Sequence, residues 1–182
     1  SAAAALSTSL VSTMRAAAPR PIVVLHCHDL GQHLNCYGVE TVNSPNLNRF
    51  ASQGVLFERN FCTAPQCSPS RASIFTGRYP HSNGVMGLTH ADFAWDLNPG
   101  EQHLGQLLKG AGYSTHGVGV IHETRSGGKR CGFDDYTNES KAQGMADAVI
   151  AKLRAVGRSP DKPFYIQAGS IEPHRLGGPN RD

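Results

Sequence analysis

The sequence predicts an α/β protein built around a mostly parallel sheet, and three observations lead to this expectation. Residues 22–25 (Ile-Val-Val-Leu) form a short, apolar, β-branched run, which is typical of a buried parallel strand. Further central strands are expected at 113–120 and 164–168, with helical patterns between them. Strands that alternate with helices favour parallel pairing. Polar residues follow each run, and open α/β sheets carry their chemistry at the carboxyl ends of strands, so we expect the functional site there.

Composition limits the possible classes of protein. The chain has 182 residues, of which 17% are charged, 7% aromatic and 39% hydrophobic, as expected for one soluble globular domain with a real core. The net charge of +3 is mild, and the basic residues are scattered. We therefore expect no nucleic-acid partner and no membrane partner. No apolar run approaches the length of a transmembrane helix.

Residues 1–20 differ from the rest of the chain. They are rich in Ala and Ser, begin without Met and lack the continuous apolar core of a secretory signal. We interpret them as a disordered leader, or as sequence upstream of a start at Met14, and we expect a cytoplasmic protein. Residues 21–182 are then the ordered part.

The first helix is expected at 44–54, with Ser44 as its N-cap and Pro45 at its first position. Residues 55–61 alternate enough between apolar and polar types to predict a strand. The buried stripe of the helix would consist of Leu47, Phe50 and Ala51. The other expected elements are amphipathic helices at 103–111 and 140–156 and a surface loop at 86–100. Residues 132–136 are expected to be a loop only because they resemble one in the family described below.

A second helix is expected to open within the segment Cys67–Gly77. Ser68 is a good N-cap, and Pro69 fits the first helical position because its missing N–H costs nothing there. Residues expected to dock the helix and to end it are Ile74, Phe75 and Gly77.

This arrangement would place Cys67 just before a helix N-terminus, where free N–H groups and the macrodipole favour an anion. Arg71, one turn further on, adds a fork of donors suited to tetrahedral oxyanions. The alternative for Cys67 is a buried structural cysteine before an ordinary helix. The other four cysteines either pair in an oxidising compartment or remain thiols in the cytosol; they are Cys27, Cys36, Cys62 and Cys131.

The pattern Cys-x-Pro-Ser-Arg at 67–71, followed by Thr76-Gly77, resembles the signature of the sulfatase family. The resemblance covers nearly all of residues 21–182 and is closest to sulfamidase-like members. It implies an alkaline-phosphatase-like α/β/α sandwich, of which this chain would be the N-terminal portion. It also implies that the formylglycine-generating enzyme oxidises Cys67 to formylglycine, whose hydrate is the nucleophile, and that Arg71 helps to hold this hydrate.

The family also carries a pair of aspartates after the first strand, and both bind a divalent cation, usually calcium. Asp29 matches the second of these positions, whereas His28 occupies the first. Calcium prefers oxygen ligands and imidazole suits softer metals. Either the metal differs, or His28 lies beside the site and another oxygen fills the gap. The resemblance therefore implies a divalent metal, with Ca²⁺ as the expected ion, at Asp29, His28 and Cys67.

Two further histidines match family positions that contact the sulfate and the leaving group. The family pattern Gly-Lys-x-His appears here as Gly-Val-Ile-His at 119–122, so His122 matches and Val120 replaces the lysine. This replacement removes a positive charge from the anion site. His174, in Glu-Pro-His-Arg at 172–175, matches a histidine of sulfamidase-like members. The alternatives are a polar residue that caps a strand for His122 and a solvated loop residue for His174.

The resemblance implies hydrolysis of sulfate esters or N-sulfo groups on a sulfated small molecule or sugar. One alternative is a phosphate or phosphonate monoester hydrolase of the same superfamily. Another is a truncated chain that binds anions or partners without turnover, because the family's remaining metal ligands, an aspartate and an asparagine, lie further downstream. We expect this piece alone to be inactive.

Overall fold

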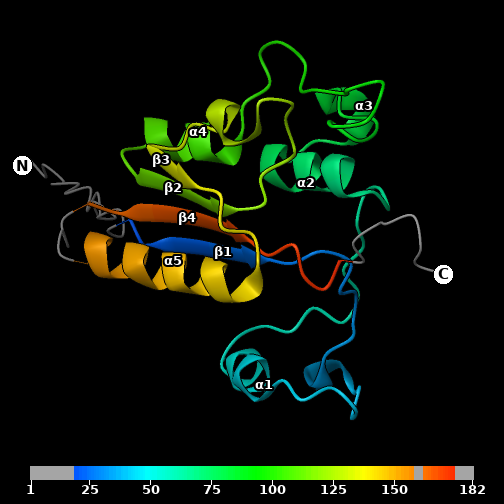
Figure 1. Ribbon diagram of the computed structural model, residues 1–182, viewed down its shortest axis with the longest axis vertical. Coiled ribbons are helices and arrows are strands. Elements are labelled where there is room, and N and C mark those ends of the chain that lie inside the picture. Colours follow the sequence, from blue (N-terminus) through cyan, green and yellow to red (C-terminus); the bar gives the residue numbers. More distant parts are fainter. Residues whose placement is uncertain (1–18, 158–161, 175–182) are drawn as a thin grey trace, which may run out of the picture.

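A parallel sheet forms the centre of the molecule. The computed structural model describes residues 19–157 and 162–174, so most of the predicted leader and the end of the chain from Arg175 lie outside the described residues. The strands are β1 (Ile22–His26), β2 (Ser114–Gly119), β3 (Asp135–Thr137) and β4 (Phe164–Gly169). They pair in the order β1-β4-β2-β3, and every pairing is parallel (Figure 1). The predicted α/β class with a mostly parallel sheet is confirmed.

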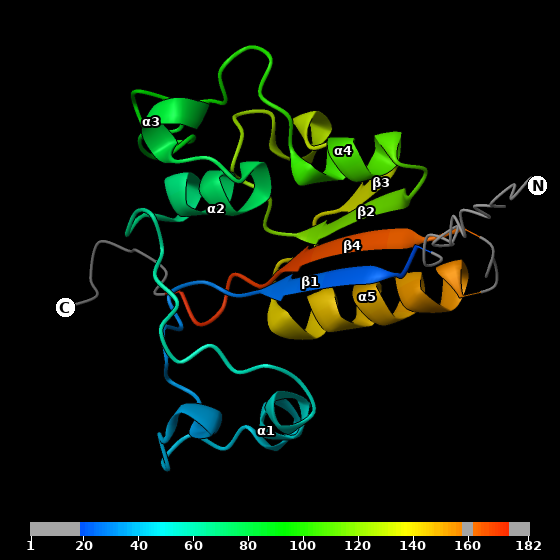
Figure 2. The same ribbon diagram turned by 180° about the vertical axis from the view of Figure 1, so that it is seen from behind.

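Helices cover both faces of this sheet. Helix α5 (Ala142–Val156) packs on one face, and α4 (Leu104–Gly110) packs on the other, with α2 (Cys67–Thr76) beside α4 towards the carboxyl ends of the strands (Figures 1 and 2). The core under α5 contains Val118, Val149, Ile166 and Ala168. The shorter helices are η1 (Asn35–Tyr37), α1 (Pro45–Ser52), α3 (Pro80–Asn83) and η2 (Gly127–Arg130). None of the helices in the described residues is long and apolar enough to cross a membrane.

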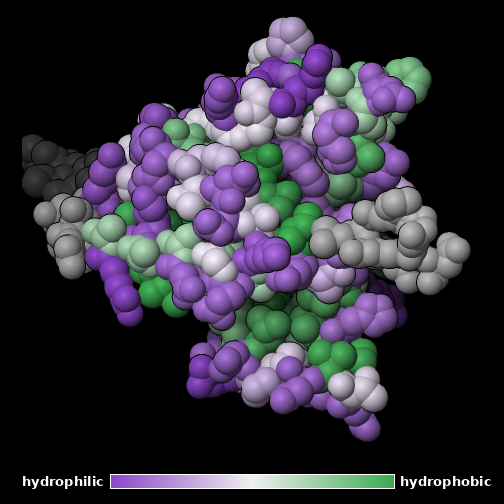
Figure 3. Space-filling model, in the orientation of Figure 1, coloured by the Kyte–Doolittle hydropathy of each residue, from purple (hydrophilic) through white to green (hydrophobic). Residues whose placement is uncertain are grey.

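The predicted strand at 55–61 is wrong. The structure forms neither helix nor strand there, and Val55 is 78% exposed and Phe61 85% exposed. The buried stripe predicted for α1 is also wrong, because Phe50 is 76% exposed. Figure 3 shows hydrophobic surface below α5, in the region of α1 and the segment that follows it. Alternating apolar residues indicate that a segment can pack against an apolar surface, but the sheet described here provides no such surface for residues 55–61.

The start of α2 also differs from the expectation. Gln66 is the N-cap and Cys67 the first helical residue, so the helix begins two residues earlier than predicted. Ser68 does not cap the helix, because it is buried and its hydroxyl lies 3.4 Å from the hydroxyl of Thr89. Phe75 docks the helix as predicted, whereas Ile74 is 64% exposed. Gly77 ends the helix with a φ of 67°, a conformation that favours glycine.

The segment 132–136, expected to be a loop, contributes the start of β3. This strand is only three residues long and lies at the edge of the sheet. The Tyr136 hydroxyl donates to the carbonyl of Gly119 at 2.7 Å, which fixes β3 to the end of β2. Short edge strands of this kind leave little periodicity to detect in a sequence.

Candidate active site

The carboxyl ends of β1, β4 and β2 meet at one edge of the sheet. Beyond the strands, the N–H of Ser170 donates to the carbonyl of His26 at 3.0 Å, and that of Val120 donates to Gly169 at 2.8 Å. These bonds hold the three following segments side by side. The ring of His28 therefore lies 5.0 Å from that of His122 and 5.3 Å from that of His174, between centroids. The three histidines that follow the strands thus gather at the edge where the sequence predicted a site.

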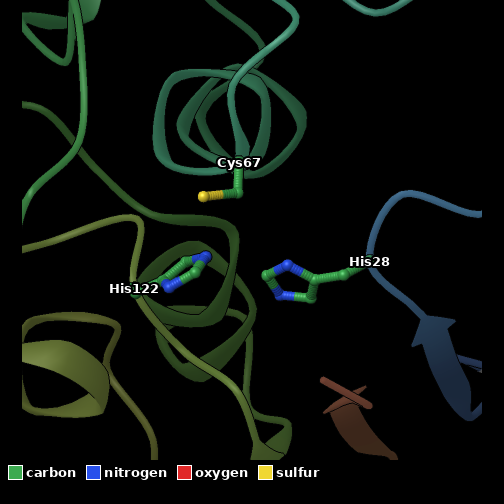
Figure 4. A group of neighbouring side chains, drawn as sticks. All are labelled: His28, Cys67 and His122. Carbon is green, nitrogen blue, oxygen red and sulfur yellow. The ribbon is translucent and has the colours of Figure 1, made fainter. Parts of the chain in front are cut away.

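Cys67 faces this histidine group from the first turn of α2. Its Sγ and one ring nitrogen from each of His28 and His122 lie within 4.8 Å of one another, and the three side chains point towards a common centre (Figure 4). All five cysteines are free thiols in the structure. The predicted nucleophile position is therefore next to His28 and His122.

Arg71, one turn along α2, is buried and holds the segments together. Its Nη2 lies 2.7 Å from His28 Nε2, and its Nη1 lies 3.3 Å from His26 Nε2. Nη1 also donates to the carbonyl of Val120 at 3.2 Å. Because a guanidinium only donates hydrogen bonds, both histidine nitrogens act as acceptors. The contacts of Arg71 are thus neutral groups, and its positive charge stays at the site.

Burial and this charge keep the nearby imidazoles neutral. Burial first, and Arg71 second, lower the pKa of His26 to about 3, of His28 to about 4 and of His122 to about 3. Burial also lowers the pKa of Arg71 itself, but a guanidinium remains charged at neutral pH. At pH 7 the site therefore combines one cation with neutral rings.

Glu123 lies beneath the site and is fully buried. Its carboxylate accepts hydrogen bonds from the backbone N–H of His122 at 3.0 Å, from His103 Nε2 at 3.2 Å and from Gln167 Nε2 at 2.7 Å. Burial raises the pKa of Glu123, but the hydrogen bond from His103 and the charge of Arg71 outweigh it and lower the pKa to about 2. Glu123 is thus an anion that positions His122.

His174 and Asp29 lie at the outer side of the group. His174 Nε2 lies 3.6 Å from Asp29 Oδ2, and the Asp29 side chain is 61% exposed. Asp29 has a φ of 50°, in the left-handed region that residues other than glycine seldom adopt. It is not among the three residues whose ligand atoms converge at Cys67. The structure therefore brings His28, Cys67, His122 and Arg71 together, and places Asp29 with His174 beside them.

Three residues of the site belong to no motif recognised in the sequence, namely His26, His90 and Glu123. The ring of His90 stacks 5.5 Å from that of His122. His26 precedes His28 by two positions at the end of a strand, a spacing that puts both side chains on one side. That spacing was a signal that could have been used. No comparable local signal existed for His90.

The donor set near Cys67 does not fit a calcium ion. Calcium prefers several oxygen ligands, whereas the converging atoms here are two imidazole nitrogens and a sulfur. The residue at the first aspartate position, His28, also accepts a hydrogen bond from a cationic guanidinium. An open cleft of about 920 Å³ leads to the site, and its lining includes His28, Asp29, Cys67 and Arg71.

Comparison with solved structures identifies the class of fold to which this site belongs. The structure superimposes on a protein of the alkaline phosphatase superfamily from Vibrio parahaemolyticus with a TM-score of 0.59 and 16% identity, over 90% of this chain and 44% of that one. It also matches the phosphonate monoester hydrolase of Agrobacterium radiobacter with a TM-score of 0.62 and 20% identity, over 86% of this chain and 42% of that one. These similarities show the alkaline-phosphatase-like α/β fold.

The sequence comparisons are more specific. Residues 21–181 match the sulfatase family, and this chain belongs to it. The chain is 30% identical to human N-sulphoglucosamine sulphohydrolase over 175 residues, which are 92% of this chain and 34% of that protein. It is 38% identical to mouse steryl-sulfatase over 114 residues, which are 58% of this chain and 18% of that protein. The chain thus spans between about a fifth and a third of these two relatives.

Proposed function

We propose that this chain carries the nucleophile-bearing part of an enzyme that hydrolyses sulfate esters or N-sulfo groups. The observation that carries the proposal is the convergence of Cys67, at the first turn of α2, with buried Arg71 and the neutral rings of His28 and His122. A helix N-terminus and a guanidinium without a carboxylate contact favour a tetrahedral anion next to position 67. Membership of the sulfatase family makes sulfate the first candidate for that anion.

The resemblance to sulfatases implies that the formylglycine-generating enzyme oxidises Cys67 to formylglycine in the mature protein. One hydroxyl of its hydrate attacks sulfur as the bond from sulfur to the leaving group breaks. The second hydroxyl, once deprotonated, re-forms the aldehyde as the carbon–oxygen bond to sulfate breaks. Arg71 is held by three acceptors and binds and orients the sulfo group with little reorganisation. His122 is neutral at pH 7 and serves as a hydrogen-bond partner rather than a cationic acid. His174, oriented by Asp29, is left as the proton donor to the leaving group.

The family generally uses a divalent metal as well. In this chain, the carboxylate of Asp29 is the metal-binding oxygen donor that the sequence predicted, and it faces His174. A calcium ion at Asp29, His28 and Cys67 remains a prediction. The converging donor atoms near Cys67, two imidazole nitrogens and a sulfur, do not favour it. We therefore assign no step of the reaction to a metal at these residues.

An N-sulfo group on an amino sugar is the preferred substrate class. One relative, 30% identical over 92% of this chain, is an N-sulphoglucosamine sulphohydrolase. A solved structure that is 25% identical over 86% of this chain and 35% of that chain, with a TM-score of 0.67, contains its substrate D-glucosamine-2-N,6-O-disulfate. Both support a sulfated sugar as the partner of the full-length protein.

The test uses the full-length protein that contains this chain, produced together with a formylglycine-generating enzyme. Turnover of an aryl sulfate, glucosamine N-sulfate and an aryl phosphate is compared for the wild type and Cys67→Ala, with Cys36→Ala as the control because Cys36 is a free thiol outside the lining of the cleft. Loss of sulfate turnover in Cys67→Ala alone supports the proposal. Retained activity in that variant contradicts it, and faster turnover of the aryl phosphate would favour the phosphate or phosphonate hydrolase alternative.

Two further expectations belong with this proposal. The 182-residue piece is expected to be inactive on its own, because the family's remaining metal ligands lie downstream of the matched region. A cytoplasmic location is supported by the four cysteines other than Cys67, which are all free thiols, since extracellular proteins more often pair their cysteines. Cell fractionation with an antibody against the chain tests this location.

A further inference from the structure

The two ring nitrogens of His28 have different surroundings. Nε2 lies 2.7 Å from Arg71 Nη2, whereas Nδ1 is buried and has no hydrogen-bond partner. A guanidinium carries only donors, so Nε2 must present its lone pair and cannot carry a proton. The single proton of the ring therefore sits on Nδ1. Arg71 thus fixes His28 as the Nδ1–H tautomer.

This N–H is a buried donor on a ring that lies next to the nucleophile position. His28 is 3% exposed. One of its ring nitrogens, one ring nitrogen of His122 and the Sγ of Cys67 lie within 4.8 Å of one another (Figure 4). A buried donor without an acceptor loses its hydrogen bond to water and gains none in return, so proteins rarely leave one unsatisfied without a reason. A ligand that accepts a hydrogen bond at this place would make up for that loss.

The surrounding charge selects the type of ligand. Arg71 donates to three neutral acceptors, on His28, His26 and Val120, and none of the ion pairs among residues 19–157 and 162–174 includes it. The acceptor for the His28 donor thus lies beside a positive charge that no carboxylate contacts, although buried Glu123 offsets part of it without touching it. An anionic oxygen fits this position better than a neutral one.

A cation fits poorly, although two histidines and a cysteine resemble a zinc site. A metal at Nδ1 needs the lone pair of that nitrogen, which the Arg71 contact replaces with a proton. The same metal would also stand close to a permanent positive charge.

We propose that His28 is an oxyanion-binding residue, whose Nδ1–H donates to one oxygen of a sulfate or phosphate group beside position 67. This assignment deepens the proposed function, since it concerns the group that the same site binds. A histidine donor, held by Arg71, would then stand where the family pattern has a cation-binding aspartate.

The first test reads the tautomer directly in the 182-residue chain, without any turnover. Nitrogen-15 NMR of histidine-labelled protein at pH 7 distinguishes Nδ1–H from Nε2–H rings, and the signals of His28 are assigned by their loss in His28→Gln. The proposal expects an Nδ1–H tautomer whose Nδ1 signal shifts when inorganic sulfate is added, but not with sodium chloride at the same ionic strength. An Nε2–H tautomer overturns the proposal, as does a His28 ring that responds to Zn²⁺ or Ca²⁺ and not to sulfate.

The second test separates the two ring nitrogens by substitution. Gln places an acceptor near the Nε2 position and so keeps the partner of Arg71, but it has no group at Nδ1; Asn keeps a donor near Nδ1. Binding of inorganic sulfate and of inorganic phosphate is measured by calorimetry. We expect about 10- to 100-fold weaker binding in His28→Gln and a smaller loss in His28→Asn. His81→Gln is the matched control, because His81 is an exposed residue of α3.

Equal affinity in the wild type and in folded His28→Gln contradicts the proposal. If His28→Gln fails to fold, the His28 signals are assigned by their loss in His28→Asn, and the tautomer of the wild-type ring still decides the matter. Both measurements are independent of turnover, so a full-length protein that hydrolyses no sulfate would count against the proposed function while leaving this anion site standing. Preference between sulfate and phosphate then indicates which group the site takes.

Discussion

The substitution Glu123→Gln tests how the buried carboxylate supports the site. Oε1 of Glu123 accepts from His103 Nε2 and Gln167 Nε2, and Oε2 accepts from the backbone N–H of His122. His103 Nδ1 accepts from the N–H of Gly105 at 3.0 Å, so its proton is on Nε2 and the ring is a neutral donor. Glu123 thus faces three donors with two oxygens.

A glutamine has only one oxygen, so at least one of these donors must face an NH₂ group. The loss includes one hydrogen bond to a charged acceptor, about 1.5–3 kcal/mol, and an unsatisfied buried donor. It also removes the negative charge that offsets buried Arg71. We therefore expect the free energy of unfolding to fall by about 2–5 kcal/mol, within the range for breaking a buried charged network.

The assay is urea unfolding of the 182-residue chain at pH 7, followed by the fluorescence of its single tryptophan, Trp95, and by circular dichroism. Coincident transitions would justify a two-state treatment. Glu58→Gln, at an exposed position, is the control and should change stability by no more than about 0.5 kcal/mol. A loss below about 0.5 kcal/mol for Glu123→Gln, at an unchanged m-value, would refute this reasoning.

Three further perturbations follow from the same contacts. The fold holds His26 and His122 neutral down to about pH 3, whereas unfolded histidine titrates near its ordinary pKa of 6.5. The unfolded state therefore binds more protons between these pH values. The free energy of unfolding should be highest above about pH 6.5 and should fall below it, by at most about 1.4 kcal/mol per pH unit for each ring. An unfolding free energy from urea titrations that stays constant from pH 7 to 4 would contradict this. Gly119→Ala should lower the free energy of unfolding by about 2–5 kcal/mol, because a φ of 78° and the backbone of β4 both oppose an added Cβ. Gly38→Ala, with a φ of 90° and no atom within 4 Å of the added Cβ, should lower it by about 1–2 kcal/mol. Equal shifts of the melting temperature in the two variants would contradict the expected clash with β4. Tyr136→Phe should lose about 0.5–1.5 kcal/mol, since its hydroxyl donates to the end of β2; unchanged urea unfolding would show that this bond contributes nothing.

Local pattern was enough to predict the sheet and the edge that carries the site. The strands expected at 22–25, 113–120 and 164–168 are β1, β2 and β4, and the expected helices at 103–111 and 140–156 are α4 and α5. Because parallel strands end at the same edge, His28, His122 and His174 were expected near one another, and the structure places them there. The sequence is sufficient to place a residue when its position depends only on where a strand ends.

Other features depended on partners that no local pattern shows. Glu123 bonds to Gln167, 44 positions away, and Arg71 contacts His26, 45 positions away. The hydroxyl of Ser68 has its partner 21 positions away, at Thr89, so the best N-cap in the sequence is not the N-cap of the helix. At 55–61, apolar alternation predicted a strand although the described sheet offers no neighbour to pair with.

The most direct test of the central claim is peptide mass mapping of the native protein around position 67. We expect a peptide in which Cys67 has lost its sulfur and carries an aldehyde, while peptides with Cys62 keep their thiol. A native protein in which Cys67 remains entirely a thiol would contradict the proposed hydrolase.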